Sequence, residues 1–363
     1  MTRFSLFNKI AVEFSGTGKK RRYFENEYVQ FKSEEGDTVI EVEFGERKKE
    51  SELILGDKRQ HFAKSNDEFL ITDGERQIAC GNNWQTMSCA ELIPEDLTRT
   101  LIEGEIRQKA TEDAAAMIHA SGVKYQNTVT LFPAWRHTGK TNTMILLLQK
   151  GAQMLSDDRL WVEADGTVHP YHVPVHILPY NFRSFPDLEA NQSVINRVRG
   201  EVHQKINDLV AERSSTIAGG INQINRHLIR PTNSHVHLSE LFPGQQLSST
   251  AELSNLVFLQ THSGGTSDIQ YQSLDVSDVV KKLSVINYYE WDRDLEEVYG
   301  AYDHLFPDQP SKRDQLNSLV ETQKDIFRQI AEKHDCYELY VPREDRWSDS
   351  TKHRIVSQIE SMN

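Results

Sequence analysis

Residues 134–141 read Ala134-Trp135-Arg136-His137-Thr138-Gly139-Lys140-Thr141. This stretch matches the Walker A pattern GxxxxGK followed by Ser or Thr, with Ala134 in place of the first glycine. The apolar residues 128–132 before it predict a strand, and residues 141–150, closed by Gly151, predict a helix. Proteins build phosphate sites from a strand, a tight loop and a helix start. The stretch therefore predicts a nucleotide-binding loop.

Three residues of this loop have the chemistry that a magnesium-bound polyphosphate needs. Gly139 gives the backbone freedom, Lys140 supplies an ammonium for the β and γ phosphates, and Thr141 supplies a hydroxyl for Mg²⁺. The three bulky residues after Ala134 are expected to point outward, which leaves Arg136 able to contact phosphate or substrate. We expect all of residues 134–141 to contact ATP.

An acidic pair follows at the end of the next predicted strand. Residues 154–155 begin this strand, and Ser156-Asp157-Asp158 ends it. Transfer chemistry on a bound nucleotide needs a metal-holding acid at such a position. One carboxylate can bind Mg²⁺ while its neighbour accepts the proton of an attacking hydroxyl. The structural alternative is an exposed turn, which Ser and Asp also favour.

Together with residues 117–123, which contain His119, these motifs resemble HPr kinase/phosphorylase and its relatives in the phosphoenolpyruvate carboxykinase-like fold. The resemblance covers residues 95–180 and implies an α/β P-loop core of mixed β-sheet and helices. It implies that Lys140 holds the phosphates, that Thr141 and Asp158 coordinate Mg²⁺, and that Asp157 is the catalytic base. It also implies that His119 lies beside Asp157 and orients it. The family's signature for binding the HPr protein is missing, so HPr is not the expected substrate.

We predict three regions along the chain. Residues 1–94 form a β-rich, antiparallel N-terminal region, in which the glycines and lysines at 16–20 make a basic hairpin turn rather than a second phosphate loop. Residues 95–290 form the catalytic core, with a helix over 97–116 and a helical insertion at 183–235. Residues 291–363 are mainly helical, with a break at Pro307 and Pro310. The aromatic residues at 288–291 are expected to anchor these helices to the core.

A locally basic patch at residues 226–231 offers a further candidate. Phosphoryl transfer commonly uses an arginine to neutralise developing charge, and Arg230 is the choice for this role. An ordinary solvated or ion-paired arginine is the alternative.

The bulk properties restrict the partners. The 363 residues carry a net charge of −13, which disfavours nucleic acid or an anionic membrane as the main partner. Cys80, Cys89 and Cys336 lack the spacing of a disulfide framework or zinc site, and no run of about 18 apolar residues predicts a membrane span. We expect a cytoplasmic protein.

The expected function is that of an ATP- and Mg²⁺-dependent kinase, which transfers the γ-phosphoryl group to a hydroxyl acceptor. Two other functions are compatible with the same motifs: a P-loop ATPase acting on a partner protein, and a module that senses nucleotide without turnover. The acceptor, the choice between ATP, GTP and pyrophosphate, and the subunit number, a homo-oligomer included, are not set by the sequence.

Overall fold

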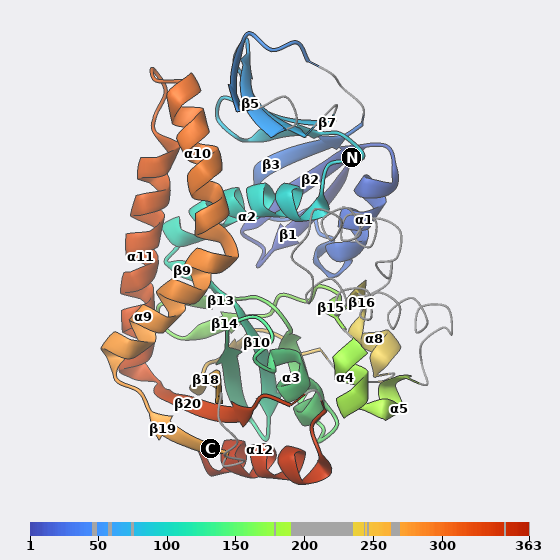
Figure 1. Ribbon diagram of the computed structural model, residues 1–363, viewed down its shortest axis with the longest axis vertical. Helices are drawn as coiled ribbons and strands as arrows, with labels where there is room; N and C mark the ends of the chain where they lie inside the picture. The colour runs from blue at the N-terminus through green and yellow to red at the C-terminus, as the bar shows by residue number, and fades with distance from the viewer. Residues whose placement is uncertain are drawn as a thin grey trace, which may run out of the picture. The chain divides into compact units, whose positions relative to one another are not determined.

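The structure is a computed structural model (Figure 1). It describes residues 1–45, 49–56, 60–73, 76–177, 179–189, 235–242, 244, 247–262, 269–344 and 346–362. The chain forms two compact units, each assembled from separate stretches. Unit 1 contains Met1–His119, Leu160–His169 and Leu274–His334, and unit 2 contains Ala120–Arg159, Pro170–Ser273 and Asp335–Asn363. Both units combine β-sheet with helices, so the predicted α/β class is confirmed.

Unit 2 is built on a six-stranded sheet with the order β12-β10-β11-β18-β20-β19. Its strands are β10 (Ala120–Tyr125), β11 (Thr128–Pro133), β12 (Gln153–Ser156), β18 (Asn255–His262), β19 (Gln270–Ser273) and β20 (Asp335–Pro342). Strands β11, β18 and β20 are parallel, and β10 is antiparallel to both β11 and β12. The carboxyl ends of β12, β11, β18 and β20 therefore lie at one edge of the sheet.

Strands β10 and β11 form the hairpin that leads to the loop at residues 134–141. Gln126 and Asn127, which connect the strands, both have positive φ, at 49° and 68°. Positive φ at both central residues is the geometry of a type I′ turn, whose twist matches that of paired strands. The strand predicted over residues 128–132 is confirmed as β11, the second strand of this hairpin.

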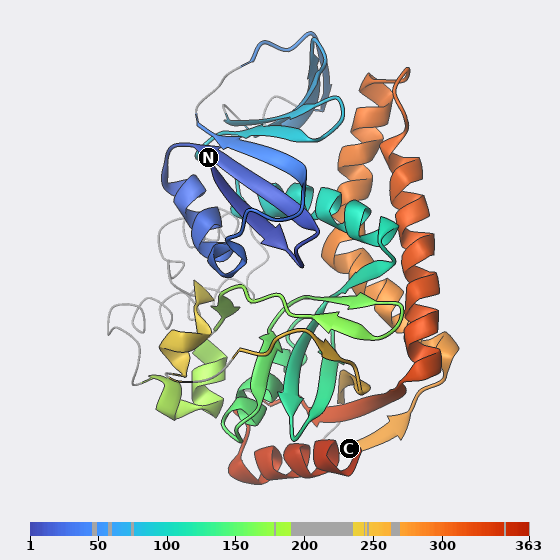
Figure 2. The ribbon, with the colours of Figure 1, turned by 180° about the vertical axis from the view of Figure 1, so that it is seen from behind.

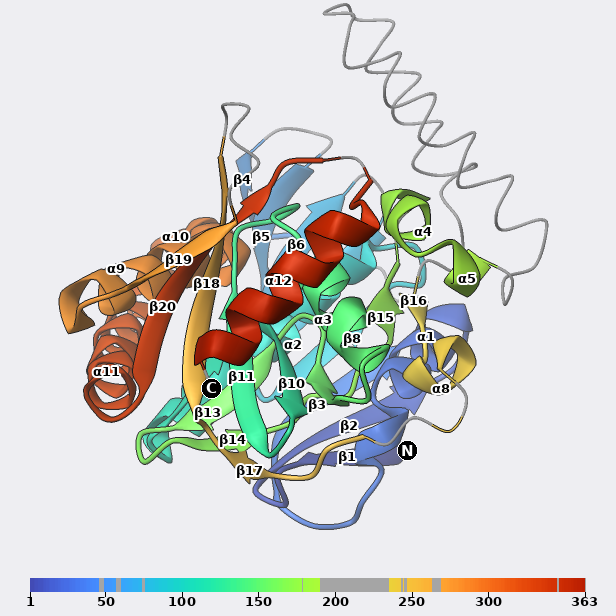
Figure 3. The ribbon, with the colours of Figure 1, turned by 90° about the horizontal axis from the view of Figure 1, so that it is seen from below.

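Helices α3 (Lys140–Leu148) and α12 (Asp349–Met362) pack together in unit 2 (Figure 3). Their apolar side chains share a core with the sheet, including Ile145, Val257 and Ile355. The smaller elements of this unit are α4 (Pro179–Ser184), α5 (Pro186–Glu189), α8 (Leu238–Leu241), β15 (Val175–His176), β16 (His235–Val236) and β17 (Ala251–Glu252). Most of the predicted helical insertion, residues 190–234, lies outside the described residues.

Unit 1 contains an eight-stranded sheet with the order β1-β2-β3-β8-β7-β6-β5-β4. Its strands are β1 (Thr2–Leu6), β2 (Ile10–Gly16), β3 (Asp37–Phe44), β4 (Leu53–Gly56), β5 (Gln60–Ser65), β6 (Glu68–Asp73), β7 (Arg76–Gly81) and β8 (Thr86–Cys89). The β-rich character of the region is confirmed, but the fully antiparallel arrangement is wrong. Strands β2, β3 and β8 are parallel. Helical turns rather than a hairpin connect β2 to β3, and strands β4 to β7 come between β3 and β8 in the chain.

A helix also replaces the hairpin turn predicted at residues 16–20. Helix α1 (Lys19–Glu27) begins where a basic hairpin turn was predicted, and the 3₁₀ turn η1 (Val29–Phe31) follows it. One Glu91 carboxylate oxygen accepts hydrogen bonds from the backbone N–H groups of Lys19 and Lys20, at 2.5 and 3.1 Å. This carboxylate occupies the helix N-terminus, where an anion would otherwise bind.

The helices of unit 1 include the antiparallel pair α10 (Arg293–Leu305) and α11 (Lys312–Lys333) (Figure 2). The break between them contains Pro307 and Pro310, as predicted. Helix α2 (Glu95–Glu112) packs against both, and α9 (Val276–Asn287) precedes the π-helical turn η3 (Tyr288–Asp292). Strands β9 (Ala115–Ile118), β13 (Leu160–Glu163) and β14 (Thr167–His169) form a small antiparallel sheet in the same unit.

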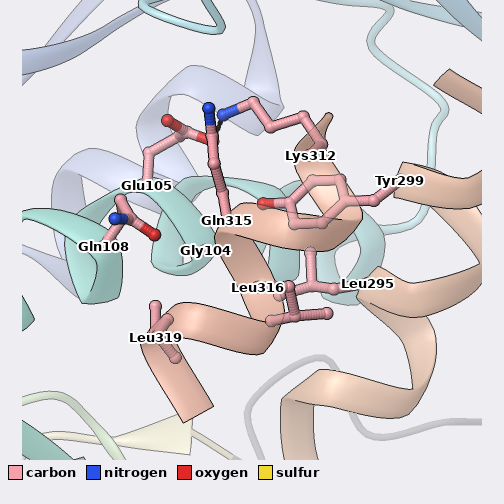
Figure 4. A pocket seen from close by; sticks show the side chains of 9 residues that line it. All are labelled: Gly104, Glu105, Gln108, Leu295, Tyr299, Lys312, Gln315, Leu316 and Leu319. Carbon is pink, nitrogen blue, oxygen red and sulfur yellow. Dashed lines mark hydrogen bonds and ion pairs between the residues drawn. The ribbon is translucent and has the colours of Figure 1, made fainter. Parts of the chain in front are cut away.

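A small polar hollow opens between α2, α10 and α11 (Figure 4). Its main feature is a buried ion pair, in which the Lys312 ammonium lies 2.9 Å from the Glu105 carboxylate. Burial raises the pKa of Glu105, and Lys312 opposes this rise. The pair therefore stabilises the charged form of a carboxyl group that the surrounding helices would otherwise disfavour.

We predict that Lys312→Met makes the stability of unit 1 depend strongly on pH. Without the ammonium, the pKa of Glu105 rises further above its unfolded value, so the native state holds a proton that the unfolded state releases. The free energy of unfolding then falls as pH rises from about 5 to about 8, with a loss of roughly 3–4 kcal/mol at the upper end. Urea denaturation at several pH values measures this slope.

The matched control is Glu105→Gln combined with Lys312→Met, which removes the titrating group. Its stability should change with pH no more steeply than that of the wild type. A pH-independent loss in Lys312→Met would contradict the assignment.

Candidate functional site

The loop after β11 is placed by the sheet. Ala134 is buried and forms a parallel bridge with Leu259 of β18, so it continues the line of β11. The φ angle of Ala134 is not positive. An alanine can therefore stand where the Walker pattern has glycine. Trp135, Arg136 and His137 are exposed, so the prediction that they point outward is confirmed.

The loop then tightens into the start of α3. His137 and Gly139 both have positive φ, at 61° and 97°, and Gly139 is the N-cap of the helix. The Thr138 N–H donates to the Trp135 carbonyl at 3.3 Å, and the Thr143 N–H donates to the Gly139 carbonyl at 2.8 Å. Lys140 and Thr141 thus lie in the first turn of α3, where the positive end of the helix dipole favours an anion.

Trp347 packs directly on this loop and was missed by the sequence reasoning. It is 3% exposed, and a Cβ added to Gly139 would lie 2.9 Å from its Cζ2 atom. Gly139 is therefore required twice, for its left-handed backbone and for the close approach of the indole. The segment that carries Trp347 follows β20, whose carboxyl end lies at the same sheet edge as the loop.

A chain of hydrogen bonds holds Trp347 and the first turn of α3 together. The backbone N–H of Trp347 donates to Ser184 Oγ at 3.0 Å, and the side-chain amide of Asn142 donates to the same oxygen at 3.5 Å. The Asn181 amide donates to Asn142 Oδ1 at 2.7 Å. All four residues are buried, so α4 and the segment after β20 fix the helix start from two sides.

The acidic pair lies at the carboxyl end of β12, which runs in the direction of β11 with β10 between them. The Lys140 ammonium is 3.7 Å from Asp158 Oδ1. The two carboxylates have different environments, because Asp157 is 6% exposed whereas the Asp158 side chain is 40% exposed. The structure thus brings together the lysine of the loop and the second acid, as the motifs predicted.

Arg159 joins the same group of charges. Its Nη2 and Nε atoms lie 2.8 and 3.1 Å from Asp158 Oδ2. The Asp158 carboxylate therefore contacts one cation on each oxygen. The sequence showed this arginine only as part of a turn, and its contact with Asp158 became visible in the structure.

The residues expected to hold Mg²⁺ fit that ion by type. Thr141 and Asp158 offer a hydroxyl and a carboxylate oxygen, which are the hard ligands that Mg²⁺ prefers beside phosphates. Among the described residues, no cluster of three or more His, Cys, Asp and Glu side chains could hold a metal by itself. An ion at this edge would need phosphate oxygens and water as its other ligands, as is usual for Mg²⁺ with nucleotides.

His119 belongs to unit 1 and lies in the chain between β9 and β10, so the motif at residues 117–123 spans parts of two strands. Its Nε2 atom lies 3.5 Å from Glu290 Oε1, and its ring meets Trp291 edge-on at 6.1 Å between centroids. Glu290 was not predicted as a partner. Asp157 belongs to unit 2, and its pairing with His119 stays a prediction.

The aromatic anchor predicted at residues 288–291 is right for one residue. Trp291 is buried, and its indole N–H donates to Glu103 at 2.9 Å. Tyr288 and Tyr289 are 37% and 42% exposed, because they lie on the outer side of η3. Arg230, the predicted cation, lies outside the described residues.

Comparison with known protein families finds no family model that matches this chain, and comparison with curated proteins finds no significant match. The resemblance to HPr kinase-like proteins therefore rests on the sequence motifs alone.

We predict that Gly139→Ala destabilises the protein more than Gly151→Ala. Both glycines have φ above 90°, so alanine costs roughly 1–2 kcal/mol of backbone strain at either position. Only at Gly139 does the new methyl group meet Trp347; at Gly151 nothing lies within 4 Å. The additional loss at Gly139 should be about 1–3 kcal/mol, measured by urea denaturation.

Adding Trp347→Leu to Gly139→Ala should recover part of the additional loss, because the smaller side chain makes room for the methyl group. Equal destabilisation by the two alanine substitutions would show that Trp347 does not constrain the loop.

Proposed function

We propose that this protein is an ATP- and Mg²⁺-dependent kinase of the HPr kinase-like type. The observation that carries the proposal is the approach of the Lys140 ammonium to Asp158 at the edge where β11 and β12 end. A phosphate-binding lysine and a metal-holding acid are the two charges that must converge on the β and γ phosphates. A cytoplasmic location belongs to the same proposal, since the three cysteines lack disulfide-like spacing.

Each residue of the site has one task in this proposal. The loop residues 134–141 surround the phosphates, and Lys140 neutralises charge on them. Thr141 and Asp158 hold Mg²⁺, which supplies electrostatic stabilisation of the transferred group when bound. Asp157, which is buried beside the more exposed Asp158, accepts the proton of the acceptor hydroxyl. His119 orients Asp157, as the resemblance implies.

The transfer needs only the nucleotide, the acceptor hydroxyl and these residues. The acceptor oxygen forms a bond to the γ-phosphorus while the bond between this phosphorus and the β–γ bridging oxygen breaks. The hydroxyl proton moves to an Asp157 carboxylate oxygen, and ADP leaves with the bridging oxygen. The acceptor is a hydroxyl group on a small molecule, a peptide or a protein serine.

The alternative of a P-loop ATPase differs in one measurable respect. A kinase moves label from [γ-³²P]ATP to an added acceptor, whereas an ATPase releases labelled phosphate at the same rate without it. A nucleotide-sensing module would bind ATP and do neither. We expect acceptor-dependent transfer when a pool of hydroxyl-bearing metabolites and peptides is supplied.

We predict that Asp157→Asn lowers turnover by about 10²–10⁴-fold and leaves the Kd for ATP within about threefold of the wild type. The asparagine keeps the shape of the side chain but cannot accept the proton, so chemistry is lost and nucleotide binding is retained. Transfer assays and isothermal titration calorimetry measure the two effects.

Asp187→Asn is the matched control, because Asp187 is an exposed acid of the same unit on α5. It should change neither quantity. Unchanged turnover in Asp157→Asn would remove Asp157 from the mechanism.

A further inference from the structure

Arg159 is the second cation, after Lys140, that contacts the acidic pair. It follows the acidic pair directly, and its side chain is 13% exposed. Two of its nitrogens face one oxygen of Asp158, with Nη2 at 2.8 Å and Nε at 3.1 Å. A guanidinium held this way is oriented as well as neutralised, because its planar donors are fixed relative to the carboxylate.

The same carboxylate also faces Lys140, so two cations share one partner. Lys140 Nζ lies 3.7 Å from Oδ1, and the Arg159 donors lie on Oδ2. Arg159 is therefore one carboxylate group away from the ammonium of the phosphate loop. The two acids of the pair balance these two cations, so a phosphoryl group bound here would compete with Asp158 for the Arg159 donors.

From these contacts we propose that Arg159 is a catalytic residue that donates hydrogen bonds to the oxygens of the transferred phosphoryl group. This inference rests on the proposed kinase function. An arginine suits the task because its fork of N–H donors matches phosphate oxygens, and phosphoryl-transfer enzymes commonly place one at the developing charge. Arg159 takes the role for which the sequence suggested Arg230.

The chemistry assigned to Arg159 involves no proton transfer. As the bond to the bridging oxygen breaks and the bond to the acceptor oxygen forms, Arg159 stays protonated and its donors stabilise the negative charge on the phosphoryl oxygens. When the nucleotide is bound, Asp158 gives up part of its contact with Arg159 and would help to hold Mg²⁺. Such donors matter more in the transition state than in the ground state, so they raise kcat more than they tighten ATP binding.

The experiment compares the binding of ADP with that of ADP plus aluminium fluoride, which imitates the phosphoryl group in transfer. Wild type and Arg159→Ala are titrated calorimetrically in the presence of Mg²⁺. We expect Arg159→Ala to weaken binding of the aluminium fluoride complex on the order of 100-fold. Its Kd for ADP alone should stay within about threefold, because a cation lost from the ground state costs little.

Two further variants make the result specific. Arg159→Lys keeps the charge but not the planar fork, and it should recover only part of the lost affinity. Lys124→Gln removes one positive charge from the same unit at the opposite edge of the sheet, near the start of β12, and should behave as wild type. Thermal unfolding of each variant confirms that it is folded.

The outcomes separate this inference from the function on which it rests. If Arg159→Ala binds both complexes as wild type does, or loses both equally, Arg159 only balances Asp158 and the inference is wrong. If wild type binds neither ADP nor its aluminium fluoride complex, the kinase proposal itself fails and takes this inference with it.

Discussion

The structure of the site depends on the common direction of β11 and β12. Because β10 is antiparallel to both, their carboxyl ends lie at the same edge, one leading into the phosphate loop and the other into the acidic pair. This arrangement lets the Lys140 ammonium come within 3.7 Å of Asp158. A β12 of the opposite direction would place the two charges at opposite ends of the sheet.

Positive charge at this edge is local. The chain as a whole carries a net charge of −13, yet Lys140 and Arg159 both lie on Asp158. In the proposed function, these two cations are the groups that meet the polyphosphate. Trp347 restricts the loop, because its indole occupies the space that a Cβ atom at position 139 would need. A preorganised loop loses less conformational entropy when it binds an anion.

Local patterns in the sequence predicted the parts of the site that are made by neighbouring residues. The loop at 134–141, the helix after it and the acids at the end of β12 all follow from short-range motifs. The missed features depend on residues far apart in the chain. Helix α1 begins at Lys19 because Glu91 caps it, and the loop is braced by Trp347 from the last part of unit 2. The separation of β9 from β10 at His119 is likewise set by tertiary structure, since the two strands join different sheets.

The central claim is that Lys140 and Asp158 act on one magnesium-bound nucleotide. Its most direct test is the calorimetric Kd of ATP, measured with and without Mg²⁺ on wild type, Lys140→Met, Asp158→Asn and the double variant. The account predicts that Mg²⁺ tightens ATP binding to wild type by about tenfold or more, that Asp158→Asn removes this gain, and that Lys140→Met weakens binding in both conditions. Wild-type affinity for ATP in Lys140→Met, or an undiminished effect of Mg²⁺ in Asp158→Asn, would contradict it.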